Sequence, residues 1–296
     1  MGSGGAAPEE AMTSKLLDEE EVVSRLESGM TIGIGGWGSR RKPMSIVRAM
    51  LRSDLRDLTI VSYAGPDLGL LCAAGKVRRA VYAFASLDSI PLEPHFRAAR
   101  QAGAIEDEPH DEGSFLLGLQ AAGWRVPFIP TRIGLGSDLL RLNDRMRTIV
   151  NPYNEDETYV AVPALTLDAA ICHLNVSDER GNAAFLGPDL YFDDLMLRAA
   201  PKGKRFISVE RTVPTAELAK VAGTELRLRI SRLMVDGVVV RPGAAHFTSC
   251  VPDYERDEAF QKEYAAAAKS PEAWQQFSDE WLAISEGDYQ RKAASR

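Results

Sequence analysis

Short runs of apolar residues alternate along the chain with segments in which apolar residues recur every three to four positions. A short unbroken apolar run is typical of a strand buried on both faces, and the wider spacing is typical of a helix with one buried side. The runs predict strands at residues 30–34, 58–63, 80–85, 126–129, 159–164, 169–174, 205–209 and 234–240. The spaced segments predict helices that begin near Asp18 and span residues 43–53, 95–102, 115–122, 193–200 and 215–219, with further helix beyond Asp253.

This alternation predicts the α/β class, with an open, mostly parallel sheet that carries helices on both faces. We expect one domain over residues 15–296 with a helical C-terminal segment, after a flexible tail at residues 1–14 that is rich in Gly, Ala and Glu. The last segment places Trp274, Phe277, Trp281 and Leu282 on one helix face. That face is expected to pack on the core or against another subunit.

Charge and cysteine content narrow the range of functions. The formal net charge of -7 disfavours a general binder of nucleic acid or membrane surfaces, because both favour basic faces. No apolar run is long enough to cross a bilayer. The three cysteines are far apart and form no CxxC motif, which disfavours a disulfide framework and a zinc site. The same cysteine usage fits the reducing cytoplasm, where we expect the protein. His95 and His110 show no metal-ligand spacing, so we expect no metal.

A glycine turn followed by cations stands at the end of the first predicted strand. Residues 35–38 read GGWG, and residues 39–42 read SRRK at the entrance of the next helix. Such a turn brings backbone N–H groups close to a phosphate, and neighbouring arginines suit a phosphate or a carboxylate. The alternatives are a plain tight turn and a solvated basic patch. The motif lacks the Gly-Lys-Ser/Thr of a P-loop and the third glycine of a dinucleotide site.

Four segments together resemble the α-subunits of class I CoA-transferases, above all those of the glutaconate type. They are SGMTIGIGGWGSRRKPMSIVRAM, GSFLLGLQAAGWRVPFIPTRIGLGSDL, LDAAICHLNVSDERGNA and PGAAHFTSC, and they follow the family's order over roughly residues 25–255. The resemblance implies the CoA-transferase (NagB/RpiA-like) fold, in which two subunits of similar fold share one active site. It also implies a β-subunit as partner in an α2β2 heterotetramer, an acyl-CoA substrate, and no separate cofactor because CoA is part of the substrate. In true transferases the β-subunit carries the nucleophilic glutamate, so this chain is expected to be incomplete alone.

One position departs from the transferase pattern. The acidic loop expected at residues 106–113 reads EDEPHDEG, and Glu112 stands before Gly113 where the family carries glutamine. A carboxylate can accept a proton there, which a glutamine cannot. Together with SRRKP and GLQAA, this segment is similar to the α-subunits of steroid ring-cleaving hydrolases, which share the fold. That resemblance implies hydrolysis of a carbon–carbon bond in the last ring of a steroid-derived CoA thioester during cholesterol catabolism, without a glutamyl-CoA intermediate.

Glu112 is therefore the predicted general base that activates water or substrate. The backbone N–H groups around residues 36–38, or Arg132, are expected to stabilise the developing oxyanion. The predicted substrate-binding residues are Gly36, Trp37, Gly38, Ser39, Arg40, Arg41, Arg132 and His246. Glu112 and Arg132 are alternatively ordinary surface residues, and His246 is equally explained by a structural hydrogen bond at a strand end. Structural roles are preferred for His173, Asn182 and Glu210.

Two other functions fit parts of the sequence. The second hypothesis is an authentic CoA-transferase of the glutaconate or 3-oxoacid type, whose β-subunit would carry the nucleophilic glutamate. A non-catalytic regulatory subunit with this fold is disfavoured, because the chain is acidic and shows no basic helix-turn-helix pattern.

Overall fold

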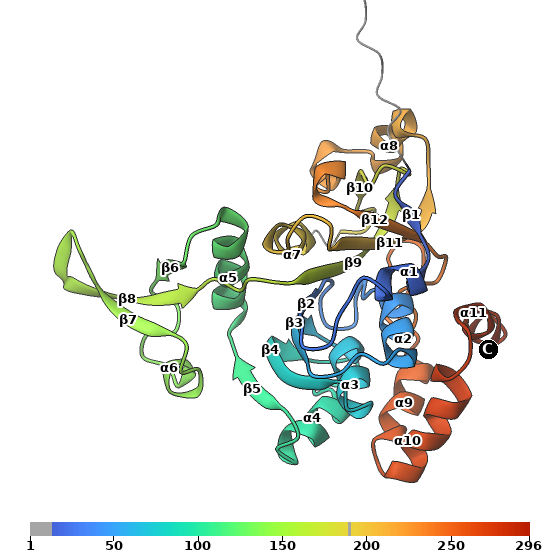
Figure 1. Ribbon diagram of the computed structural model, residues 1–296, viewed down its shortest axis with the longest axis horizontal. Coiled ribbons are helices and arrows are strands. Elements are labelled where there is room, and N and C mark those ends of the chain that lie inside the picture. The colour runs from blue at the N-terminus through green and yellow to red at the C-terminus, as the bar shows by residue number, and fades with distance from the viewer. Residues whose placement is uncertain (1–13, 189–190) are drawn as a thin grey trace, which may run out of the picture.

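A large parallel sheet organises the chain. The computed structural model describes residues 14–188 and 191–296, so the expected N-terminal tail lies outside it except for Ser14. The sheet has nine strands in the order β1-β12-β11-β9-β2-β3-β4-β5, with β10 paired to β9 (Figure 1). The strands are β1 Leu16–Leu17, β2 Thr31–Ile34, β3 Leu58–Ala64, β4 Val77–Ala85, β5 Glu106–Pro109, β9 Ala169–Ser177, β10 Ala183–Ala184, β11 Arg205–Thr212 and β12 Gly237–Val240. Only β10 pairs in antiparallel fashion, which confirms the predicted open, mostly parallel sheet.

The direction in which strands are added to the sheet reverses between β2 and β9. From β2 the chain adds β3, β4 and β5 toward one edge, and from β9 it adds β11 and β12 toward the other. Loops at the carboxyl ends of two such strands diverge, and ligands of open α/β sheets bind in the crevice between them. Since β2 ends at Ile34, the glycine turn at residues 35–38 lies directly at this position.

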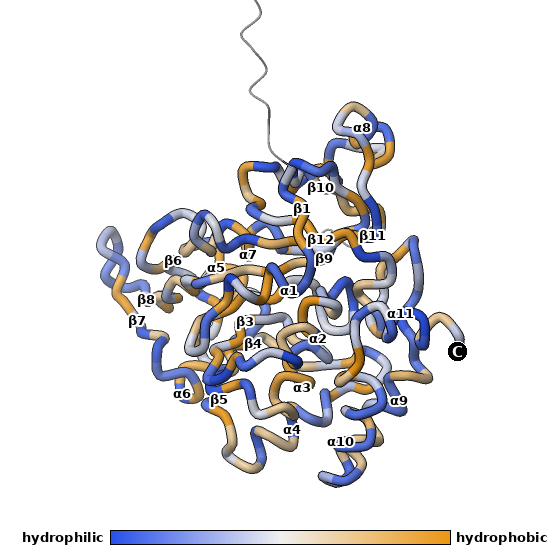
Figure 2. The backbone as a smooth tube through the Cα atoms, turned by 45° about the vertical axis from the view of Figure 1, so that its right-hand side comes forward, coloured by the Kyte–Doolittle hydropathy of each residue, from blue (hydrophilic) through white to orange (hydrophobic). Residues whose placement is uncertain are grey.

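Helices cover both faces of the sheet, and each face has its own apolar core. One layer holds α1 Glu19–Val23, α2 Met44–Arg52, α3 Pro66–Ala73, α4 Pro94–Gln101, α9 Glu258–Ala267, α10 Pro271–Phe277 and α11 Glu286–Ala294. The opposite layer holds α5 Glu112–Trp124 and α7 Asp193–Ala199, and the short α8 Thr215–Ala222 lies beside β10. Hydrophobic colour concentrates along the central strands in Figure 2. Within the described residues, none of the helices combines the length and apolar character needed to cross a membrane.

A small antiparallel sheet stands apart from the main body as an arm (Figure 1). It consists of β6 Phe128–Thr131, β7 Arg147–Asn151 and β8 Asn154–Pro163, with α6 Leu139–Leu142 in the connection. Its own core is limited to Met146, Val160 and Val162 with a few flanking residues. Strands at 126–129 and 159–164 were predicted from the sequence as part of the parallel sheet. Their assignment to that sheet is wrong, because in the described part of the chain β7 and β8 form a hairpin whose partner is β6.

Two further elements differ from the prediction. No helix was predicted at α3, whose residues are buried almost throughout, so that the apolar pattern has no polar stripe to mark a helical period. The acidic segment was expected to be a loop, but its first half is the edge strand β5, paired in parallel with β4. Glu108 on this strand is buried, and its carboxylate lies 2.7 Å from Nη2 of Arg79.

The C-terminal aromatic residues pack on the core, one of the two expected locations. Phe277 and Trp281 are buried, and the Phe260 ring lies between them at centroid distances of 5.6 and 4.8 Å. Arg48 of α2 reaches across to Glu286 of α11 with two contacts of 2.6 and 2.8 Å. The C-terminal helices are therefore an integral part of the layer that supports α2.

Candidate active site

The glycine turn after β2 is a closed bend rather than an open anion cradle. Gly36 and Gly38 have positive φ angles of 79° and 54°, which favour glycine. The three amides at residues 36–38 all have acceptors within the chain: Gly36 N–H donates to Asp193 Oδ1 (2.7 Å), Trp37 N–H to the Arg40 carbonyl (3.0 Å) and Gly38 N–H to the Tyr63 carbonyl (3.0 Å). The expectation that these amides stabilise an oxyanion is wrong, because their hydrogens are already used.

Two of the three cations after the turn are interior residues. Arg41 is 3% exposed, and its Nη1 lies 2.9 Å from Asp193. Lys42 is fully buried, and its Nζ lies 3.2 Å from Asp67; burial, which outweighs the attraction of Asp67, lowers the pKa of Lys42. Each cation has its own carboxylate, as buried charges require. The expectations of an anion-binding Arg41 and of a solvated basic patch are therefore both wrong for these two residues.

Ser39 is an interior residue as well, whereas Arg40 is partly exposed. Ser39 is fully buried and accepts a hydrogen bond from Nε2 of Gln261 in α9, so it anchors that helix and does not face a ligand. Arg40 is about one-third exposed, with Nε 2.9 Å from Asp88 and Nη1 2.8 Å from the hydroxyl of Tyr191. Of the predicted cations at the turn, Arg40 is the one that solvent and ligands reach.

Aromatic rings surround the bend. The indole of Trp37 stacks on Tyr63 at 4.5 Å and on Tyr191 at 5.1 Å, with interplanar angles of 19° and 14°. Phe84 and Phe192 tilt against the same indole at 5.3 and 6.1 Å. The residues come from the ends of β2, β3 and β4 and from the segment before α7. Trp37 is half-buried, so its free edge and the neighbouring rings form an apolar wall at the carboxyl edge of the sheet.

Glu112 opens helix α5 beside this wall. It is exposed, and Asp111 forms a capping box with Ser114 that fixes the start of the helix. The hydroxyl of Tyr63 donates a hydrogen bond to the Glu112 carbonyl at 2.9 Å. Because Tyr63 also stacks on Trp37, one ring joins the predicted base to the glycine bend.

Arg132 lies on a loop that meets the same helix. A Cβ placed on Gly113 would come within 2.7 Å of Cδ1 of Ile133, so the loop packs against the first turn of α5. The Arg132 side chain is 66% exposed and pairs with Glu157 at 3.0 Å. On this chain Arg132 is a surface arginine, and its neighbour Ile133 lies against Gly113, the residue after the predicted base.

Known proteins share this architecture. The sequence pattern of the family described as Coenzyme A transferase matches residues 18–240. The chain belongs to the Coenzyme A transferase family. The Cholesterol ring-cleaving hydrolase IpdA subunit of Rhodococcus jostii is 55% identical over 93% of this chain and 94% of its own. The protein of the same name from Mycobacterium tuberculosis is 53% identical over 94% and 97%.

The transferases of the family are more distant. One subunit of the glutaconate CoA-transferase from Acidaminococcus fermentans is 26% identical over 91% of this chain and 88% of its own. The crystal structure of that enzyme superposes with a TM-score of 0.87 at 25% identity, over 94% of this chain and 92% of the matched chain. The fold of this Coenzyme A transferase family member is thus that of a transferase subunit, while its sequence is far closer to the hydrolase subunits.

His246 lies away from the bend of this family member and faces the C-terminal helices. Its Nδ1 is 2.7 Å from the hydroxyl of Tyr289, and its Nε2 is 3.3 Å from Asp257. Burial, helped by the nearby Arg48, lowers the pKa of His246 to about 4, so the ring is neutral at physiological pH. The structural alternative for His246 fits, and the substrate-binding expectation has no support in this geometry.

His173 and Glu210, for which structural roles were preferred, meet in a buried polar cluster. His173 Nε2 lies 3.0 Å from Oε1 of Glu210, and possible ligand atoms of His173, Glu210 and Cys250 lie within 4.8 Å of one another. However, Glu210 already accepts hydrogen bonds from the Tyr254 hydroxyl and the Gly243 amide, both at 2.7 Å. A metal would have to displace these donors, so the geometry fits a hydrogen-bonded cluster.

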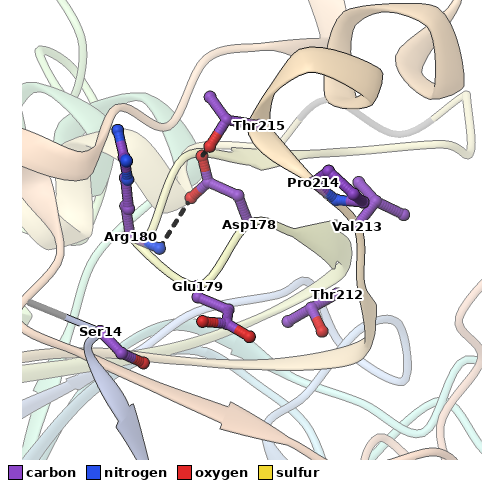
Figure 3. A pocket seen from close by; sticks show the side chains of 8 residues that line it. All are labelled: Ser14, Asp178, Glu179, Arg180, Thr212, Val213, Pro214 and Thr215. Carbon is purple, nitrogen blue, oxygen red and sulfur yellow. Dashed lines mark hydrogen bonds between the residues drawn. The ribbon is translucent and has the colours of Figure 1, made fainter. Parts of the chain in front are cut away.

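A cavity of about 410 Å³ opens at the ends of β9 and β11, remote in sequence from the predicted site (Figure 3). It is lined by Ser14, Asp178, Glu179, Arg180, Thr212, Val213, Pro214 and Thr215. Asp178 accepts bonds from the amides of Arg180 and Asn182, and also from the side chains of Asn182 and Thr215. Its carboxylate therefore holds the turn together, and Asn182 has the structural role that was expected.

The residues that hold the candidate site in place were not predicted from the sequence. Tyr63, Asp88 and Asp193 contact the bend from three different segments. No motif marks them, because each contact depends on how β3, the loop after β4 and α7 meet in space. Tyr63 ends a predicted strand, Asp88 follows one, and Asp193 begins a predicted helix, and these positions alone do not indicate a contact with the bend.

Proposed function

We propose that this chain is the α-subunit of a heteromeric hydrolase that cleaves a carbon–carbon bond in the last ring of a steroid-derived CoA thioester. The observation that carries the proposal is the identity of 53–55% over more than nine-tenths of the hydrolase subunits, compared with 26% for the glutaconate transferase subunit. Glu112 supports it, since the resemblance gives that position a glutamine in transferases. The same comparison makes an authentic CoA-transferase the weaker hypothesis.

The proposed reaction consumes one water. Glu112 removes a proton from water, and the hydroxide oxygen adds to the ring ketone carbon. The ring carbon–carbon bond then breaks, and its electron pair passes to the carbon next to the thioester carbonyl as an enolate. Return of the proton to that carbon gives an open-chain thioester with a new carboxylate. A positioned base contributes about 10²–10⁴-fold to such a step.

Other residues of this chain have supporting roles in the proposal. The wall around Trp37 would contact the apolar ring system of the substrate, and Arg40 would face one of its anions. Arg132, on the loop that packs against the first turn of α5, would stabilise the developing oxyanion. Ser39, Arg41 and His246 are left out of the site because their polar atoms serve internal contacts.

A partner subunit completes the proposed enzyme. Glu112 is exposed on this chain, whereas a general base for hydrolysis works in a cleft that controls access of water. The relatives are named as subunits, which supports a β-subunit that covers this edge, in an α2β2 heterotetramer. The buried thiols of Cys72, Cys172 and Cys250 suit the reducing cytoplasm, where we place the enzyme.

The test is turnover in heavy-oxygen water by the chain co-expressed with its partner subunit. A cyclic-ketone CoA thioester should give a ring-opened product with one heavy oxygen in the new carboxylate, and hydroxylamine should trap no glutamyl thioester. Exchange of CoA between acids without incorporation of label, together with a trapped glutamyl thioester, would instead identify a CoA-transferase.

A further inference from the structure

Two arginines share a single carboxylate beside the glycine bend. Nε of Arg40 and Nη1 of Arg256 each lie 2.9 Å from Oδ2 of Asp88. The buried cations Arg41 and Lys42 of the same region each have an acid of their own. The group of Arg40, Asp88 and Arg256 therefore carries one positive charge in excess.

One further acid, Glu258, approaches the group as a loose ion pair with Arg256. Glu258 is 58% exposed, and its carboxylate is 3.9 Å from Nε of Arg256, which is too far for a hydrogen bond. Asp88 accepts a hydrogen bond from Nε of Arg40, whereas Nη1 of Arg256 has no aligned acceptor in the described part of the chain. Two guanidinium groups that converge on one acid repel each other, and a bound anion would relieve this repulsion.

The backbone holds Asp88 in this place at a cost. Asp88 has a φ of 61°, in the left-handed region that non-glycine residues rarely adopt, and its amide donates to Oγ of Ser86. A Cβ on Gly38 would lie 3.0 Å from Oδ1 of Asp88, so the glycine lets the carboxylate approach the bend. The acid thus orients two guanidinium groups at the carboxyl edge of the sheet.

Arg40 and Asp88 border the apolar wall at the glycine bend. Arg40 and Gly38 adjoin Trp37 in the chain, and Trp37 stacks on Tyr63, which contacts Glu112. Nη1 of Arg256 is buried, but the side chains of Arg40 and Arg256 remain 36% and 26% exposed, so a ligand that lies along the wall can reach part of each. A thioester with its reacting ring near Glu112 would place another part of the molecule here.

We propose that Arg40 and Arg256 bind an oxyanion of the acyl-CoA substrate, with Asp88 as a positioning residue. The inference rests on the proposed function for the identity of the substrate. Forked guanidinium donors suit phosphate and carboxylate equally, so the anion is either a phosphate of CoA or a carboxylate of the acyl group. On this proposal Asp88 is shared because it orients both arginines toward the same anion.

The experiment compares substrates in the assembled enzyme with Arg256→Ala and Arg256→Lys. With the full CoA thioester, Arg256→Ala should raise KM about tenfold, as expected for loss of one charge-assisted contact, and Arg256→Lys should lie between. A matched control is Arg100→Ala, which removes a half-exposed arginine with an acid of its own, Asp107, at 2.6 Å. The control should leave KM unchanged. If Arg256→Ala folds poorly, the KM of Arg256→Lys serves as the test, and its melting curve checks that this variant is folded.

Truncated substrates identify the source of the anion. If it is a phosphate, the pantetheine thioester, which has none, should show no difference between wild type and Arg256→Ala. If it is a carboxylate, the difference should persist with the pantetheine thioester. It should vanish with an acyl-CoA whose acyl group carries no free carboxylate besides the thioester. An unchanged KM, or an equal loss with substrates that lack both anions, overturns the proposal.

A binding measurement separates this inference from the proposed function. Calorimetry of CoA and of pantetheine with the assembled enzyme gives the ratio of their Kd values without turnover. A failure of ring hydrolysis in the wild type would sink the proposed function. The arginine pair would be ruled out by two results together. One is a Kd ratio that is the same in wild type, Arg256→Ala and Arg256→Lys; the other is a KM effect of these variants that does not depend on the acyl carboxylate.

Discussion

The hydroxyl of Tyr63 donates a hydrogen bond of 2.9 Å to the main-chain carbonyl of Glu112. Burial, with smaller contributions from the Glu112 and Asp111 carboxylates, raises the pKa of Tyr63, so the hydroxyl keeps its proton over the whole working range of pH. The same ring stacks on Trp37. The start of α5 is thereby held against the glycine bend by a single residue of β3, and the position of the predicted base depends on it.

Replacement of Glu112 by glutamine should lower kcat of the assembled enzyme by about 10²–10⁴-fold, because an amide cannot accept the proton. The free energy of unfolding should change by no more than about 0.5 kcal/mol, since the side chain is exposed. Single-turnover kinetics and urea unfolding measure the two quantities.

Glu217→Gln is the matched control, because Glu217 is also an exposed acid in the first turn of a helix. It should leave both quantities at the wild-type value. A Glu112→Gln enzyme that turns over at the wild-type rate would remove Glu112 from the role of base.

Tyr63→Phe should preserve the stack on Trp37 and lose only the bond to the Glu112 carbonyl. We expect a loss of about 1 kcal/mol in stability, and a larger effect on kcat than on KM because the base loses its fixed position. Tyr82→Phe is the control: Tyr82 is also a buried tyrosine, on the next strand, and burial together with the neighbouring Asp107 raises the pKa of its hydroxyl. It should cost similar stability with no change in kcat, and equal kcat losses in both variants would contradict the positioning role.

Local patterns were sufficient to predict most of the main sheet. The apolar runs at β2, β3, β9 and β11 are strands in the structure, because strands buried on both faces leave an unbroken apolar signature. The hairpin of β7 and β8 was predicted only in part: the run at 159–164 marks the apolar half of β8, whereas β7 and the first half of β8 are largely exposed and gave no strand signal. Its existence depends on pairing partners, which a single strand does not encode.

The site was predictable only as a region. The order of GGWG and SRRK identifies the bend, but it does not reveal that Arg41 and Lys42 turn inward while Arg40 turns outward. That difference is decided by Asp193 and Asp67, which come from α7 and α3 and meet the cations through tertiary contacts. Charge runs in sequence therefore overstate the charge available to a ligand.

Glu286→Gln should destabilise the fold by about 3–5 kcal/mol, because it leaves the Arg48 guanidinium buried without a counter-charge. Burial alone would raise the pKa of Glu286, but the charge of Arg48 and hydrogen bonds outweigh it and hold the pKa below its ordinary value. The stabilisation by this pair is therefore present above about pH 4 and is lost as the pH falls through the folded-state pKa.

Urea unfolding between pH 3 and pH 7 tests the pair. Wild type should lose stability at the acidic end, and the Gln variant should lose less, since it has no carboxylate to protonate at this position. The nearby Asp288→Asn changes an exposed acid and should cost no more than about 0.5 kcal/mol at pH 7. A Gln variant as stable as wild type at pH 7 would show that the buried pair contributes nothing.

Glu93 should give the opposite pH dependence. It is fully buried, and burial raises its pKa to about 7, although hydrogen bonds from Tyr264 and from the amide of Phe96 oppose the shift. The unfolded carboxyl group ionises near pH 4, so between about pH 4 and pH 7 the folded state holds a proton that the unfolded state releases. Stability from this group is present at the acidic end of that window, falls as the pH rises, and levels off above pH 7, with a total of about 4 kcal/mol.

Glu93→Gln should remove this slope, because the amide does not titrate. The variant also loses an acceptor for one of its two donors, so its stability should be lower than that of wild type at pH 5, and the difference should shrink by pH 8. Unfolding curves at pH 5, 6.5 and 8 are sufficient to measure it. A difference that stays constant over this range would mean that Glu93 is ionised throughout, and its bonds to Tyr264 and Phe96 would then hold a buried charge rather than a neutral acid.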